Sequence, residues 1–226
     1  MRSIQIAIDG PAGAGKSTVA KKLADLLGFV YIDTGAMYRA ITYKALRQGI
    51  SLDNAEALTI TAEDTAIQFV RTKEGRQLIF CDGREVTEEI RSPDVSENVS
   101  KIAQFSSVRE VLVRKQQELA SNQDVVMDGR DIGTVVLPQA ECKIYLTASL
   151  EERTARRYRE LLLKGYTEEY AKIRENLAQR DEMDKNRKAG PLKIAEDAVI
   201  IDTTDLTQEE VLQKILGLLG QRRGES

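Results

Sequence analysis

The feature that most constrains the fold is a glycine-rich stretch near the amino terminus. Residues 10–17 read Gly-Pro-Ala-Gly-Ala-Gly-Lys-Ser, which fits the pattern G-x-x-x-x-G-K-[ST] in full. Residues 3–9 alternate apolar side chains and predict a buried strand, whereas residues 16–27 carry apolar side chains at helical spacing and stop before Gly28. A strand, a glycine loop and a helix in this order predict an α/β unit whose loop turns backbone amides toward a phosphate.

The chemistry of this loop follows from its residue types. The positive end of the following helix adds to the attraction for an anion. The amine of Lys16 is expected to reach β- and γ-phosphate oxygens, and the Ser17 hydroxyl is expected to bind Mg²⁺. The alternative is a glycine turn that merely joins strand to helix. Residues expected to contact a nucleoside triphosphate are Gly10, Pro11, Ala12, Gly13, Ala14, Gly15, Lys16, Ser17 and Thr18.

Strands and helices alternate along most of the chain. Apolar runs predict further strands at residues 29–33, 124–128, 142–146 and 197–202, with helices at 36–47, 149–164, 167–180 and 207–219. This alternation predicts a five-stranded parallel sheet with helices on both faces. Ligands of such sheets bind at the carboxyl ends of the strands, so the turns after Asp9, Asp33 and Asp128 define the functional edge. Asp33 and Asp128 are candidates to hydrogen-bond the groups around Mg²⁺.

A different pattern occupies residues 53–100, which hold 11 acidic and 5 basic residues. Short β-type runs flank Asp82-Gly83, a strong signal for a two-residue hairpin, and predict a small antiparallel sheet. Residues 99–119 are expected to form one helix. We therefore expect a single chain (1–226) with three parts: a core (1–52, 101–150 and 190–226), an inserted subdomain (53–100) and a helical lid (151–189).

Composition excludes several classes of function. The chain of 226 residues contains no histidine, which rules out His-based acid–base chemistry and histidine metal sites. Its net charge of −3 argues against a nucleic-acid binder or an anionic-membrane binder. No apolar run approaches the length of a membrane span. The two cysteines, Cys81 and Cys142, are expected to be buried reduced thiols, so we expect a cytoplasmic protein and, from its size and charge, a monomer.

Arginines gather in the carboxyl-terminal half. Arg153, Arg156 and Arg157 lie at i, i+3 and i+4, which places them on one face of a predicted helix, and Arg180 and Arg187 bracket the end of the next. Fixed cations and a lid that excludes water are what phosphoryl transfer between two polyanions requires. A solvated, salt-bridged helical hairpin is the alternative.

Four segments of the chain are similar to one family. Residues 8–16, residues 33–39 (Asp-Thr-Gly-Ala-Met-Tyr-Arg), residues 128–135 (Asp-Gly-Arg-Asp-Ile-Gly-Thr-Val) and the pattern Arg180-Asp181-x-x-Asp184-x-x-Arg187 resemble bacterial cytidylate kinases. The resemblance runs from Ile4 to about Asp205. It implies a P-loop kinase core with an inserted monophosphate-binding subdomain, ATP with Mg²⁺ as the donor, and CMP or dCMP as the acceptor.

The resemblance also implies roles for single residues. It implies that the CMP phosphate is held by Arg39, Arg130 and Arg187, whose guanidinium groups match phosphate oxygens. It further implies that cytosine is read by Ser100, Arg109 and Asp131, and that the sugar is contacted by Tyr38 and Asp184, with Arg180 nearby and Thr34 in support. The implied catalytic residues are Lys16, Arg130, Arg153, Arg156, Arg157 and Arg187.

Other functions stay open at the level of sequence. A UMP, AMP or shikimate kinase would share the phosphate-binding loop, and a nucleotide-binding regulatory module without turnover would need no second anion site. A GTPase is disfavoured because no N-K-x-D-type guanine reader is present. A motor or transport ATPase is disfavoured because Asp128 is followed by Gly-Arg-Asp rather than by glutamate.

Overall fold

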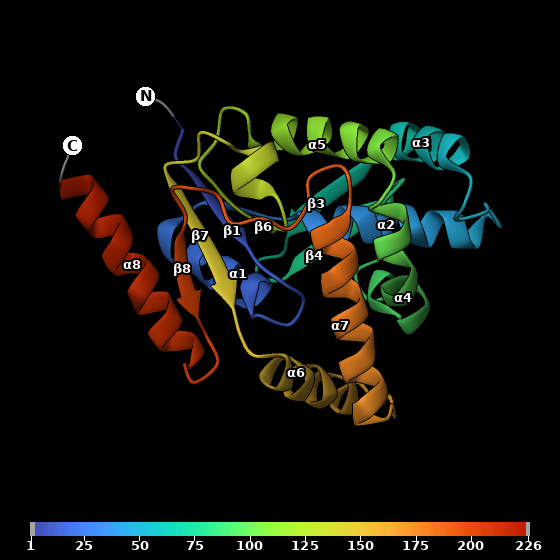
Figure 1. The fold of residues 1–226 in the computed structure, drawn as a ribbon. Coiled ribbons are helices and arrows are strands. Elements are labelled where there is room, and N and C mark those ends of the chain that lie inside the picture. Colours follow the sequence, from blue (N-terminus) through green and yellow to red (C-terminus); the bar gives the residue numbers. More distant parts are fainter. Residues whose placement is uncertain (1–2, 225–226) are drawn as a thin grey trace. The chain divides into compact units, whose positions relative to one another are not determined.

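Alternating strands and helices build a parallel sheet in the computed structural model, which describes residues 3–224 (Figure 1). The strand order is β2-β6-β1-β7-β8. The strands are β1 (Gln5–Asp9), β2 (Val30–Asp33), β6 (Val125–Gly129), β7 (Cys142–Thr147) and β8 (Val199–Asp202). The predicted five-stranded parallel sheet is confirmed. Residues 1–2 and 225–226, the outer ends of the predicted core, lie outside the described residues.

Register places the carboxyl ends of β1 and β6 at one level. Asp9 at the end of β1 pairs with Gly129 of β6 on one side and with Tyr145 of β7 on the other. Because the strands are parallel, the segments that follow β1 and β6 leave the same edge of the sheet. That edge is the one expected to carry ligand-binding residues.

The chain divides into two compact units. The first comprises residues 1–31, 120–186 and 190–226, and the second comprises residues 32–119 and 187–189. Helices of the first unit are α1 (Lys16–Leu27), α6 (Leu150–Leu163), α7 (Tyr170–Asn186) and α8 (Gln208–Gly224), with a π-helical turn, η2, at Ile132–Val136. The sequence-based division into core, insertion and lid stays a prediction.

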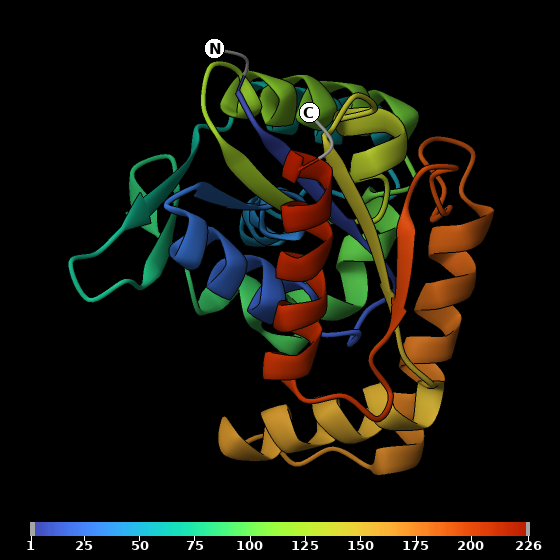
Figure 2. The same cartoon turned by 90° about the vertical axis from the view of Figure 1, so that its left-hand side faces the viewer.

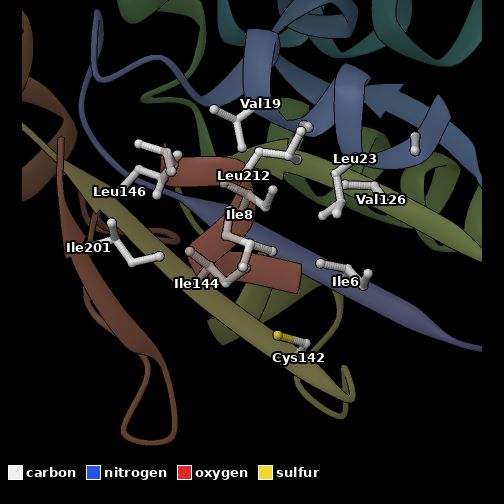
Figure 3. Packing of buried hydrophobic residues seen from close by; sticks show 14 of the residues in the cluster. Ile6, Ile8, Val19, Leu23, Val126, Cys142, Ile144, Leu146, Ile201 and Leu212 are labelled. Atoms are coloured by element: carbon white, nitrogen blue, oxygen red, sulfur yellow. The ribbon is translucent and has the colours of Figure 1, made fainter. Parts of the chain in front are cut away.

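The main core of the first unit lies between the sheet and two helices. Ile6, Ile8 and Ile144 of the central strands meet Leu23 of α1 and Leu212 of α8, as Figure 3 shows. Cys142 is fully buried in the same cluster, as expected for an inert thiol. This packing fixes α1, whose first turn carries Lys16 and Ser17, against the sheet.

A helical hairpin follows β7. Helices α6 and α7 lie against each other (Figures 1 and 2) around Leu161, Ile173 and Leu177, and Tyr158 contacts Tyr170 edge to face with ring centroids 5.7 Å apart. The phosphate loop contributes Ala12 to this cluster. The hairpin is therefore packed directly on the loop that precedes α1.

The second unit combines helices with a small antiparallel sheet. Its elements are α2 (Thr34–Arg47), α3 (Ala55–Asp64), β3 (Ile67–Arg71), β4 (Gln77–Cys81), β5 (Arg84–Glu85), η1 (Glu89–Arg91), α4 (Pro93–Ile102) and α5 (Ser106–Ala120). The strand order is β3-β4-β5. Asp82 and Gly83 join β4 to β5 with positive φ angles of 51° and 78°, as the predicted hairpin turn requires.

Three predictions about local structure were wrong. Residues 99–119 form the end of α4 and most of α5 rather than one helix, because Gln104 and Phe105 make turn hydrogen bonds to Lys101 and Ile102. Helix α3 lies in the region where only a sheet was expected, and α7 continues six residues past Arg180 to Asn186. Among residues 3–224, none of the helices has the length and apolar character needed to cross a membrane.

Candidate phosphoryl-transfer site

The phosphate loop, residues 10–17, requires glycine for steric reasons. At Gly10, where φ is 148°, a Cβ atom would lie 1.9 Å from the carbonyl oxygen of Leu146 in β7. At Gly13, where φ is 79°, a Cβ atom would lie 3.0 Å from the Cβ of Arg153 in α6. Close approach of the sheet and of α6 therefore shapes the loop, in addition to the positive φ angles that glycine tolerates.

Lys16 is buried at the amino-terminal end of α1. Its Nζ donates a hydrogen bond of 2.8 Å to the carbonyl oxygen of Pro11, across the loop. Burial, reinforced by the positive charge of Arg130, lowers the pKa of Lys16 to about 7, although Asp128 opposes the shift. A cation held in this environment is stabilised by any anion that enters the loop.

Ser17 and Asp128 bring two oxygen ligands together beside the loop. The Ser17 hydroxyl donates to Oδ2 of Asp128 over 2.9 Å, and the Tyr31 hydroxyl donates to Oδ1 of the same carboxylate over 2.8 Å. A hydroxyl next to a carboxylate is a donor set that fits Mg²⁺ bound mainly through phosphates and water. The ring of Tyr31 packs against the core while its hydroxyl orients Asp128.

Asp9 links the phosphate loop to the segment after β6. Each of its carboxylate oxygens accepts a hydrogen bond of 2.8 Å, one from the amide of Ile132 and one from the amide of Gly133. Burial raises the pKa of Asp9 to about 6 against the effect of these two bonds, and the charge of Asp131 adds to the increase. Sequence reasoning identified Asp9 only as a strand end, because its partners are more than 120 residues away.

Arg130 is held by α7. Its Nε donates to Oδ2 of Asp184 over 2.8 Å, and both side chains are largely buried. Although burial alone would lower it, Asp184 and Asp128 keep the pKa of Arg130 above its usual value. Arg130 and Arg180 also contribute to the low pKa of Lys16, so these cations share one electrostatic environment with the loop.

The three arginines of α6 make different contacts. Arg153 is buried, and it donates to the carbonyl oxygens of Ala148 and Ala12 over 3.0 and 3.1 Å and pairs with Asp181 at 2.7 Å. Arg156 bonds Glu152 on its own helix and donates to both oxygens of Thr203, over 3.0 Å to the hydroxyl and 2.6 Å to the carbonyl. Arg157 pairs with Glu160.

Two of these arginines therefore tie α6 to other parts of the unit. Arg153 reaches the phosphate loop, and Arg156 reaches the residue after β8. Thr203 itself donates toward the carbonyl oxygens of Thr147 and Ala14. Local sequence did not reveal that Asp181 pairs with Arg153 or that Thr203 accepts from Arg156, because each of these partners lies in a distant segment.

In the second unit, Asp33 organises one group of candidate residues. Its carboxylate accepts a bond of 2.8 Å from the amide of Ala36 and so caps α2. The same carboxylate pairs with Arg39 at 3.1 Å and with Arg91 at 3.3 Å. Arg91 was not singled out in the sequence. Thr34, the first residue of α2, follows directly.

A second group in this unit contains the expected readers of the base and sugar. The guanidinium of Arg109 on α5 lies 5.4 Å from the ring centroid of Tyr38 on α2, so the structure brings these two residues together. Ser100 is buried on α4. Arg187, also buried, belongs to the short segment 187–189 of the same unit. Asp131 is buried in the first unit, at the start of η2.

Comparisons with known proteins identify the family of this chain. A family model described as cytidylate kinase matches residues 6–221. The cytidylate kinase of Caldanaerobacter subterraneus subsp. tengcongensis is 56% identical over 94% of this chain and 93% of its own length. That of Caldicellulosiruptor bescii is 52% identical over 96% of both chains.

Solved structures show the fold at a greater distance. A gluconokinase from Sinorhizobium meliloti superposes with a TM-score of 0.52 at 13% identity, covering 99% of this chain and 97% of its own. This similarity concerns the fold alone. The family match and the full-length identity are decisive, and the chain belongs to the cytidylate kinase family.

Proposed function

We propose that this chain transfers the γ-phosphoryl group of ATP to CMP or dCMP, giving ADP and CDP or dCDP. One observation carries the proposal: identity of 56% to a cytidylate kinase extends over 94% of the chain and so includes both compact units. The phosphate loop, the buried Lys16 and the Ser17–Asp128 pair support the donor half of the reaction.

The donor polyphosphate is proposed to bind the amides of residues 10–17. Binding an anion there returns Lys16 to its charged form, and the ammonium then faces the oxygens on which charge develops during transfer. Ser17, oriented by Asp128, is proposed to bind Mg²⁺, with the carboxylate supporting it through the hydroxyl or a water. When bound, Mg²⁺ supplies charge neutralisation for the phosphate oxygens.

Ten residues are proposed to bind the acceptor. In the second unit these are Thr34, Tyr38, Arg39, Ser100, Arg109 and Arg187; in the first they are Arg130, Asp131, Arg180 and Asp184. Guanidinium groups would bind the CMP phosphate, and the Asp131 carboxylate would accept a hydrogen bond from N4 of cytosine. Uracil presents an acceptor at that position, so the same carboxylate disfavours UMP.

The reaction requires no general base. An oxygen of the CMP phosphate is already anionic at neutral pH and attacks the γ-phosphorus, while the bond from that phosphorus to the β–γ bridging oxygen breaks. The electron pair of the broken bond stays on ADP. Arg153, Arg156 and Arg157 are proposed to hold α6 over the donor and to shield the reaction from water, as Arg153 and Arg156 already connect α6 to neighbouring segments.

A coupled assay of ADP release tests the proposal. The purified chain is given ATP and Mg²⁺ with CMP, dCMP, UMP, AMP or shikimate in turn. We expect turnover with the two cytidine nucleotides to exceed turnover with the others. Preference for a different acceptor would replace the cytidine assignment, and nucleotide binding without ADP release would favour a regulatory module. Gel filtration with light scattering tests the expected monomer.

A further inference from the structure

The segment that carries Arg130 and Asp131 is anchored by a residue from another strand. Asp9, at the end of β1, is 5% exposed and spans two consecutive amides, with one oxygen on Ile132 and the other on Gly133, both at 2.8 Å. A carboxylate that accepts two amide hydrogen bonds fixes both the position and the orientation of that peptide segment.

This anchor replaces the usual helix cap. The π-helical turn η2 begins at Ile132, and Asp131 stands at its N-cap position without a side-chain capping bond. The carbonyl oxygen of Asp131 accepts from the amides of Val135 and Val136 over 2.9 and 3.2 Å. The backbone of Asp131 is thus held on one side by η2, and the first amides of η2 are held by Asp9.

The space around the anchor is filled. A Cβ atom on Gly133 would lie 3.2 Å from Cδ of Lys143 and 3.4 Å from Oδ2 of Asp9. Nζ of Lys143 is itself held by the carbonyl oxygen of Pro138 at 2.7 Å and by Asp197 at 2.9 Å. The amides of η2 therefore have little freedom to move away from the Asp9 carboxylate.

Ionisation of a carboxylate at this position costs free energy. Burial opposes its ionisation, and the negative charge of Asp131 opposes it further. An ionised group held against such costs is typical of functional sites, where local stability is given up for geometry. Asp9 also immediately precedes Gly10, the first residue of the phosphate loop.

We propose that Asp9 is a positioning residue for acceptor recognition: by holding the amides of Ile132 and Gly133, it sets the direction in which Arg130 and Asp131 meet CMP. This inference rests on the proposed function. In this proposal Asp9 acts through the backbone of the next segment, whose amides it holds, and not by contact with a substrate. The Asp9 carboxylate thereby connects the start of the phosphate loop to the residues proposed to bind the acceptor.

The test compares Asp9→Asn with Asp124→Asn. An amide side chain keeps the shape of Asp9 but presents an NH₂ group to one of the two backbone amides, so one bond is lost. Asp124 is a matched control because its Oδ1 also accepts a backbone amide, that of Ile4 at 2.7 Å, at the opposite end of the same strands. Steady-state KM and kcat are measured for ATP, CMP and UMP.

We expect Asp9→Asn to raise KM for CMP by about tenfold or more, because the segment that carries Arg130 and Asp131 loses a charge-assisted anchor, and to raise KM for ATP by less, through the lost charge near Lys16. The ratio of kcat/KM for CMP to that for UMP should fall, because Asp131 is no longer held in place. Asp124→Asn should leave all three quantities unchanged even where it lowers Tm.

A second variant guards against a folding defect. Gly133→Ala inserts a methyl group between Cδ of Lys143, at 3.2 Å, and Oδ2 of Asp9, at 3.4 Å, without altering the charge of the carboxylate, and it should reproduce the increase in KM for CMP. Amide hydrogen exchange of Ile132 and Gly133 should accelerate in both variants. If wild type uses CMP and both variants keep its KM for CMP and its discrimination against UMP, the inference is wrong while the function stands. If the wild-type protein does not phosphorylate CMP, both the inference and the proposed function are wrong.

Discussion

Ser17 and Asp128 lie 111 residues apart in the chain and are joined by a hydrogen bond of 2.9 Å. The bond connects the first turn of α1 to the end of β6, and the Tyr31 hydroxyl holds the second carboxylate oxygen. A serine in this motif is thus not only a candidate metal ligand. Its hydroxyl is also oriented by the carboxylate of Asp128.

Loss of the Asp128 carboxylate should weaken the use of Mg²⁺. For Asp128→Asn we expect the concentration of Mg²⁺ needed for half-maximal turnover to rise by roughly 10- to 100-fold, the usual effect of removing a group that orients a metal ligand. A magnesium titration at saturating ATP and CMP measures this shift. Ser17→Thr keeps a hydroxyl and should stay close to wild type, and an unchanged titration in Asp128→Asn would contradict the metal assignment.

Removal of the Lys16 amine should abolish turnover and stabilise the empty protein. Lys16 is buried and its pKa is lowered from 10.5 to about 7, so its charged form costs the folded state free energy. For Lys16→Met we expect no measurable phosphoryl transfer and a Tm higher by roughly 2–8 °C without nucleotide.

The gain in Tm should depend on pH with a defined sign. Between pH 7 and 10.5 the unfolded lysine binds more protons than the folded one, so the contribution of this group to wild-type stability rises with pH across that window. The Tm difference between Lys16→Met and wild type should therefore be largest below pH 7 and disappear near pH 10.5. A difference that grows with pH would contradict the buried-cation interpretation.

Truncation of Arg130 should affect the acceptor more than the donor. For Arg130→Ala we expect kcat/KM for CMP to fall, and the loss corresponds to about 2–4 kcal/mol of transition-state stabilisation. KM for ATP should change little. The control is Arg174→Ala, since Arg174 is an exposed arginine of α7 that pairs with Glu151. Intact turnover of CMP by Arg130→Ala would remove Arg130 from the acceptor site.

Arg153→Lys tests the connection between α6 and the phosphate loop. The guanidinium of Arg153 donates to the carbonyl oxygens of Ala148 and Ala12 and pairs with Asp181 at the same time. A single ammonium group cannot make these three contacts in the same geometry. We expect a stability loss of about 1–3 kcal/mol and a higher KM for ATP than in wild type. Urea unfolding and donor kinetics measure both effects, and Arg159→Lys, at an exposed position of the same helix, provides the control.

Local sequence predicted the parallel sheet, the phosphate loop and the Asp82-Gly83 hairpin, because each depends on a short pattern with a strong physical requirement. It failed at the break between α4 and α5. Ile102 and Val108 are both fully buried in one cluster, yet in a continuous helix they would point about 120° apart. The turn at Gln104 and Phe105 resolves that conflict, and only the three-dimensional core reveals it.

The residues of the candidate site also fall into those that local sequence predicts and those that it does not. Lys16, Ser17 and Arg130 follow from motifs and from the family resemblance. Asp9 and Thr203 do not, because their roles consist of hydrogen bonds to segments more than 40 residues away. No local spacing encodes such partners, so the groups that orient the motif residues become visible only in the folded chain.

The contact at Gly10 has a consequence for nucleotide affinity. Since the backbone of this residue lies close against Leu146 of the neighbouring strand, the curvature of the loop is set by the sheet itself. An incoming triphosphate finds the amides already oriented, and little conformational entropy is lost from the loop on association. The affinity of the phosphate loop for the donor therefore derives from the rigidity of the central strands as much as from the charges that line the loop.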